Sequence, residues 1–144
     1  MKNRPTPRAE RAFIDAIRCS LLAIGLAVVM PIAATAQDAT GLWRTEATQE
    51  GYLEVQIAPC GAELCGTILR ARDLQGHEQP YPHVGRWMIR NMVPTGPNNW
   101  GNGQIWDPRN DRTFRSRMEL SGNNLAVSGC VLGFCESQSW SRVN

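Results

Sequence analysis

Apolar and polar residues alternate with a period of two through most of the chain after residue 37, and no helical periodicity competes with this pattern. From Tyr52 to Ile57, the side chains of Leu53, Val55 and Ile57 fall on one face. Alternate side chains of a strand point to opposite faces, so this pattern indicates half-buried β-strands. We expect about eight strands, over residues 40–45, 52–57, 66–72, 86–93, 100–106, 113–120, 125–129 and from 136 onwards.

Residues that favour turns separate these segments, in a long loop over 73–85, another loop over 94–99 and turns over 107–111 and 121–124. Short antiparallel strands joined in sequence favour an all-β fold, a small up-and-down β-barrel, with a β-sandwich as the alternative. Gly101 and Gly103 interrupt one strand and predict a bulge or a sharp bend there. A barrel of about eight strands is filled by side chains or holds one small ligand. The short strands favour the filled interior.

The first 36 residues have the composition of a signal peptide. Five basic residues precede an apolar run from Leu21 to Met30, and Ala34-Thr35-Ala36 provides a cleavage site before Gln37. The run is too short to span a bilayer comfortably. We therefore expect a signal peptide over 1–36, a single β-barrel domain over 37–144, and an exported protein, periplasmic or secreted, without a transmembrane segment after cleavage.

Removing the leader changes the charge of the chain. Residues 37–144 contain ten arginines, no lysine and eleven acidic residues, a net charge of −1. The basic character of the full sequence therefore belongs to the leader and does not indicate nucleic-acid binding. The absence of lysine excludes Schiff-base chemistry and a P-loop in this domain.

Four cysteines remain, in two units with four residues between the cysteines of each. An even number of cysteines in an exported chain indicates disulfides. Three pairings are possible, and a hairpin loop of this length favours the local ones. A four-cysteine zinc site is the alternative. The expected bridges are Cys60–Cys65 and Cys130–Cys135.

Few residues suggest catalysis, and no catalytic motif is present. The two histidines, His77 and His83, lie in the long loop, but their spacing does not match a zinc motif and the prolines of the loop exclude a helix. They are weak candidates for metal or acid–base chemistry, and we expect neither a metal nor a cofactor. Asp107 and Asp111 flank one turn and form a second weak acid–base candidate.

Three tryptophans, Trp87, Trp100 and Trp106, are candidates for lining a ligand pocket, although filling the core is their default role. At the ends of the domain, Trp43 and Arg142 lie on the first and last strands, which are neighbours in a closed antiparallel barrel. Trp140 shares a face with Arg142. We expect the Arg142 guanidinium to stack on Trp43 and to cover one end of the core.

The ordered pattern over the predicted domain resembles the exported bacterial proteins grouped as domain of unknown function 2147. The matching positions are Gly41, Trp43, Cys60, Gly61, Leu64, Cys65, Gly66, Gly103, Asp107, Pro108, Gly129, Cys130, Cys135, Gln138, Trp140 and Arg142. The start Gly41-x-Trp43 with a late arginine is also similar to lipocalins, in which that tryptophan packs under an arginine. The resemblance implies a secreted lipocalin-like barrel and no particular reaction.

Three functions are compatible with these observations. The first is a binding module without catalysis, for a small apolar molecule at the barrel mouth or for an envelope partner. The second is an enzyme that uses the loop of His77 and His83. The third is a structural envelope protein with a filled core.

Overall fold

The computed structural model describes residues 38–144, so the predicted signal peptide over 1–36 lies outside the described residues. Nine strands account for most of this part of the chain: β1 (Gly41–Arg44), β2 (Tyr52–Cys60), β3 (Glu63–Arg72), β4 (Glu78–Gln79), β5 (Trp87–Gly96), β6 (Asn99–Asp107), β7 (Arg112–Ser121), β8 (Asn124–Val131) and β9 (Phe134–Arg142). No helix within residues 38–144 is long and apolar enough to span a membrane.

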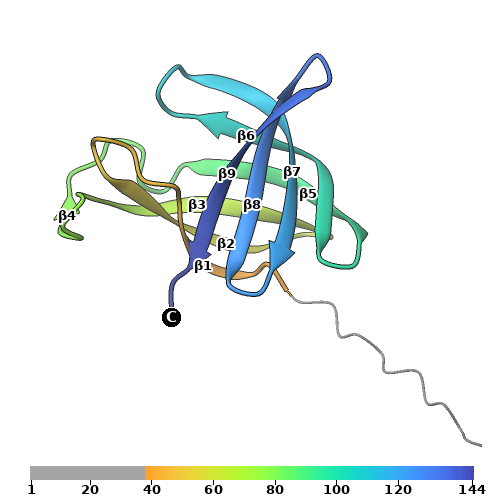
Figure 1. Ribbon diagram of the computed structural model, residues 1–144, viewed down its shortest axis with the longest axis horizontal. Helices are drawn as coiled ribbons and strands as arrows, with labels where there is room; N and C mark the ends of the chain where they lie inside the picture. The colour runs from red at the N-terminus through yellow and green to blue at the C-terminus, as the bar shows by residue number, and fades with distance from the viewer. Residues whose placement is uncertain (1–37) are drawn as a thin grey trace, which may run out of the picture. The chain divides into compact units, whose positions relative to one another are not determined.

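Eight of the strands form a closed antiparallel barrel (Figure 1). Consecutive strands pair from β5 to β9, β3 pairs with both β2 and β5, and β1 joins β2 to β9 and closes the ring. The two-residue strand β4 extends the sheet beside the end of β3. The expected up-and-down barrel is therefore confirmed.

Two details differ from the sequence prediction. The long loop contains β4, which is too short to leave a periodic pattern. The predicted loop over 94–99 is mostly strand, because β5 continues to Gly96 and β6 begins at Asn99. Asn98 has a positive φ of 59°, which asparagine tolerates, so a tight turn is sufficient there. A register shift between Trp100 and Gly103 is the predicted bulge.

Large side chains fill one half of the barrel. Trp43 and Trp140 are completely buried, and each indole N–H has an acceptor: the Ala39 carbonyl at 2.8 Å for Trp43 and the Gln138 side chain at 3.2 Å for Trp140. On β7, alternation directs Phe114, Ser116, Met118 and Leu120 to the interior, as the sequence predicts. We call this half, where the chain ends, the closed end.

The junction between β1 and β9 is the shortest contact in the ring, with only two residue pairs. Arg142 strengthens it: its guanidinium carbon lies 4.3 Å from the centroid of the Trp43 ring. The same guanidinium donates hydrogen bonds to the carbonyls of Thr40 at 2.7 Å and Asp38 at 2.8 Å. One side chain therefore joins the two ends of the domain and covers the buried indole.

Gly41 makes this contact possible. Its φ of 129° is disfavoured for any residue with a Cβ, and a Cβ at this position would lie 2.7 Å from Nη1 of Arg142. A larger residue would strain the backbone and displace the guanidinium.

The structure contains the two local disulfides at opposite ends of the barrel. Cys60–Cys65 joins β2 to β3 at the closed end, with Cα atoms 5.7 Å apart. Cys130–Cys135 joins β8 to β9 at the other end, where the two cysteines are directly opposed and their Cα atoms are 4.0 Å apart. Each bridge closes a short loop, so it mainly fixes a hairpin turn.

Replacing Arg142 by alanine should lower the free energy of unfolding by about 2–4 kcal/mol, because it removes a cation–π contact and two charged hydrogen bonds. Arg142→Lys should retain less than half of the stability that Arg142→Ala removes, because an ammonium lacks the planar array of N–H donors of a guanidinium. Chemical denaturation measures both effects. Arg117→Ala, at an exposed position of β7, is the matched control and should change stability by less than about 0.5 kcal/mol. Equal losses in the Arg142→Ala and Arg117→Ala variants would contradict this role.

Candidate functional site

A cavity of about 780 Å³ occupies the barrel end opposite Arg142, and we call this the open end. Its deep wall is apolar and is formed by Leu53, Ala71, Met88, Ile105, Phe114 and Val127. The expectation that side chains fill the whole interior is therefore wrong for this half. The reason is side-chain volume: Ala71 and Gly129 line the open end, whereas two tryptophans occupy the closed end.

The mouth of the cavity is acidic. Four carboxylates and one guanidinium line it, contributed by the β1–β2 loop, the end of β6, the β6–β7 turn and β9. These residues are Glu46, Glu50, Asp107, Arg109 and Glu136. With the carboxylates ionised, their formal charge is −3, so a ligand that enters the mouth meets a negative potential.

Arg109 neutralises one of the carboxylates. It donates from Nε to Asp107 Oδ1 at 3.0 Å and from Nη2 to Asp107 Oδ2 at 2.9 Å. The side-chain hydrogen bond from Arg109 is the main cause that lowers the pKa of Asp107 below its usual value. Asn110 also donates to Asp107, at 3.1 Å. Asp107 is therefore an ionised, well-paired group and is not poised to take up a proton near neutrality.

Tyr81 lies at the same mouth, half-buried against the core. Its pKa is raised, first by burial of the hydroxyl and then by the negative charges of Asp107 and Glu50. All three causes favour the neutral phenol, which remains a hydrogen-bond donor for a ligand at the mouth.

The Ser116 hydroxyl is a polar group deeper in the barrel. It follows Phe114 on the interior face of β7, and the residue is only 5% exposed. Within residues 38–144 its oxygen has no hydrogen-bond partner. A buried hydroxyl without a partner is costly. Ser116 does not line the cavity, so its hydroxyl is not part of the candidate site.

The two histidines have separate surroundings. His77 is exposed, and its Nδ1 lies 3.2 Å from Oδ2 of Asp73, whose other oxygen accepts the His77 backbone N–H at 2.8 Å. This backbone hydrogen bond is the main cause of the lowered pKa of Asp73. His83 packs edge-on between the rings of Tyr81 and Trp106. In the described part of the chain, no three His, Cys, Asp or Glu side chains are grouped as a metal site.

The three tryptophan candidates do not line the cavity. Trp100 belongs to the core cluster. Trp87 and Trp106 border a separate groove of about 140 Å³. Arg86 covers Trp106 with its guanidinium carbon 3.5 Å from the ring centroid, whereas Trp87 is 44% exposed.

The two aspartates at the β6–β7 turn also have different partners. Asp107 lines the cavity, whereas Oδ1 of Asp111 accepts the Trp106 indole N–H at 2.8 Å and a hydrogen bond from Arg86 at 3.2 Å. The Trp106 bond is the main cause that lowers the pKa of Asp111. The acid–base pair suggested by their spacing is therefore not assembled.

A sequence pattern described as "Uncharacterized protein conserved in bacteria (DUF2147)" matches residues 41–142, which include all eight barrel strands. The chain belongs to this family. No curated protein matches the sequence.

The barrel is also similar to a solved structure described as "Protein HP1028 from the human pathogen Helicobacter pylori belongs to the lipocalin family". The TM-score is 0.60 with 14% sequence identity, over 74% of this chain and 84% of the other. At this identity the likeness shows the fold alone, and the fold of this family member is lipocalin-like.

Sequence reasoning missed the acidic mouth because its members come from four separate segments. Glu46 and Glu50 lie in an irregular loop, and Glu136 lies in a strand whose exposed residues show no clear alternation. The sequence carries one weak signal for the mouth, at Asp107-Pro108-Arg109. Asp107 is the last residue of β6, and an arginine two residues later can pair with its carboxylate.

The chain has two tyrosines, so absorbance at alkaline pH can isolate Tyr81. We expect Tyr81→Phe to remove a component that titrates above the ordinary tyrosine value of 10.0. Because the folded state keeps this proton longer than the unfolded chain, stability should fall as the pH rises from the ordinary pKa through the raised one. Glu50→Gln should lower the pKa of Tyr81, whereas Glu63→Gln at the closed end should not. A Tyr81 component at or below the ordinary value would show that the mouth is neither apolar nor acidic.

Proposed function

We propose that this protein is a binding module that holds a small, largely apolar molecule in the cavity at the open end of its barrel. The observation that carries the proposal is a space of about 780 Å³ with an apolar wall and a polar, acidic mouth, lined in similar measure by apolar and polar side chains. Its volume lies within the roughly 300–1,000 Å³ of small-molecule sites in proteins, and its lining is more polar than in most of them, so the ligand needs a polar end as well as an apolar body. The lipocalin-like fold is consistent with such a role.

The charges at the mouth define the ligand further. An anionic head group would be held beside Glu46, Glu50 and Glu136, and the one arginine at the mouth, Arg109, is already paired with Asp107. Repulsion in this partly enclosed site disfavours a carboxylate or a sulfonate. The proposed ligand therefore has a neutral or cationic polar end at the mouth and an apolar body beside Leu53 and Phe114.

The pairing of the polar groups supports binding rather than catalysis. Asp107 is held ionised by Arg109, and Tyr81 is held neutral by burial and by nearby negative charge. Neither shift places a group near neutral pH, where a general acid or base is most effective.

We also propose that the protein acts outside the cytoplasm. Its two disulfides are typical of an oxidising compartment. The basic and apolar leader before Gln37 is consistent with export.

Two fluorescent probes with the same aromatic body test the proposal. N-phenyl-1-naphthylamine is neutral, and 1-anilinonaphthalene-8-sulfonate carries one negative charge. We expect the neutral probe to bind with one site per chain and more tightly than the sulfonate. Leu53→Trp places a larger side chain in the cavity and should weaken binding of the neutral probe by at least about tenfold, because the ligand and the indole compete for the same volume.

Leu69→Trp is the matched control, because it makes the same exchange at a β3 position that is 41% exposed and does not line the cavity. This variant should bind the neutral probe like the wild type. Equal affinities in the Leu53→Trp and Leu69→Trp variants, or tighter binding of the sulfonate, would contradict the proposed site.

A further inference from the structure

The turn between β8 and β9 contains a residue that is unfavourable there on two counts. Leu132 is 94% exposed and has a φ of +49°. The other non-glycine residues with positive φ in the described chain are Asn91, Asn98, Asn102 and Asp111. Asparagine and aspartate tolerate this conformation, whereas for leucine the Cβ makes it costly.

The hairpin itself does not require leucine. Val131 pairs with Phe134, so Leu132 and Gly133 are the two central residues of a tight turn in which both have positive φ. Asn-Gly is the preferred sequence for this turn. Leu132 therefore lowers the stability of the turn and exposes apolar surface, and neither cost is offset by packing. Strain of this kind at an exposed position indicates a function for the side chain.

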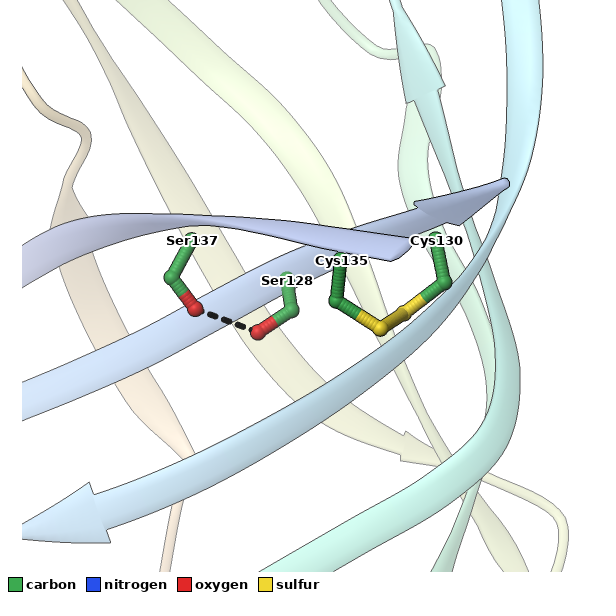
Figure 2. Close-up of a disulfide and its surroundings, with 4 residues drawn as sticks. All are labelled: Ser128, Cys130, Cys135 and Ser137. Carbon is green, nitrogen blue, oxygen red and sulfur yellow. Dashed lines mark hydrogen bonds between the residues drawn. A yellow bond between two sulfur atoms is a disulfide. The ribbon is translucent and has the colours of Figure 1, made fainter. Parts of the chain in front are cut away.

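The residues beside Leu132 enlarge the apolar surface. Phe134 is 84% exposed and Val131 is 45% exposed. We call Val131, Leu132 and Phe134 the apolar tip. The Cys130–Cys135 disulfide joins the residue pair next to Val131 and Phe134. Figure 2 shows this disulfide and, on the same face of the hairpin, the hydrogen bond between the Ser128 and Ser137 hydroxyls. The tip is therefore presented on a rigid hairpin.

The tip is part of the rim of the open end. Val131 and Phe134 line the cavity, and Leu132 lies at the end of a hairpin that projects at the top of Figure 1. A ligand that enters or leaves the cavity on this side passes apolar side chains.

The shape and charge of this region identify the surface that it fits. A two-residue turn is convex and narrow, so it can enter a soft apolar layer, whereas a protein partner would need a matching pocket. The carboxylates of Glu46, Glu50 and Glu136 line the same mouth and would be repelled by anionic lipids. A bilayer of zwitterionic lipids has an apolar acyl-chain region that can take up the turn, and its head groups carry no net charge to repel these carboxylates.

We infer that the apolar tip inserts into the interfacial region of a lipid bilayer and turns the mouth of the cavity towards the membrane. Insertion removes the apolar surface of Leu132 and Phe134 from water, which favours reversible attachment. Exchange of the ligand between the bilayer and the cavity rests on the proposed function; insertion of the tip does not.

Flotation of the protein with phosphatidylcholine vesicles tests the inference, with thermal unfolding as a second measurement. The wild type should float with the vesicles. Leu132→Asn should reduce the bound fraction at least about tenfold, because it replaces the most exposed apolar side chain by a polar one. The same substitution should raise the midpoint of thermal unfolding, since asparagine is favoured in this turn. A purely structural role for Leu132 predicts a lower midpoint instead.

Leu69→Asn removes an exposed leucine from β3, away from the tip, and should leave vesicle binding unchanged. Leu53→Trp should also bind vesicles normally, so loss of probe binding and loss of membrane binding can be told apart. The inference is overturned if the wild type does not float, or if the Leu132→Asn variant floats like the wild type. It is equally overturned if the wild type forms a dimer that Leu132→Asn abolishes and neither protein binds vesicles, since the tip would then contact a second copy.

Discussion

The stack of Arg142 on Trp43 is the contact on which the barrel depends most. β1 has four residues and meets β9 through two residue pairs, whereas β8 and β9 share eight. A closed barrel opens most easily where two strands share the fewest residue pairs, and an open barrel would expose two unpaired strand edges. The guanidinium compensates by binding the backbone carbonyls of Asp38 and Thr40 while covering the buried indole. Closure of this end allows the other end to remain hollow, because the closed half supplies a packed core without help from a ligand.

The alternation of apolar and polar residues was sufficient to predict the eight strands of the barrel, their antiparallel order and the interior face of β2 and β7, but not β4 or the extension of β5 to Gly96. The spacing of the cysteines was sufficient to predict the two local disulfides. The volume of the interior could not be predicted in this way, because the pattern shows which side chains face inwards but not how they meet across the barrel. Ala71 and Gly129 are small residues at inward positions of strands that are far apart in sequence, and only the register places both at the cavity.

The negative charge at the mouth of the cavity could not be predicted from the sequence either. Glu50, Asp107 and Glu136 are separated by long stretches of sequence, and each is unremarkable in its own loop or strand. Their effect appears only in the folded chain, where Asp107 and Glu50 help to raise the pKa of Tyr81. Leu132 is a different case. The spacing of the cysteines predicts the hairpin, but only the backbone conformation shows that Leu132 has a positive φ, which is unfavourable for leucine.

If the open half of the barrel holds a small molecule, part of the protein should keep that molecule through purification. Native mass spectrometry of the protein purified from the cells that produce it, without detergent or organic solvent, detects this complex. We expect a population with one small neutral or cationic molecule per chain, absent from the Leu53→Trp variant and present in the Leu69→Trp variant. A spectrum with only the mass of the bare protein, or a bound molecule that Leu53→Trp does not displace, would contradict the proposed binding.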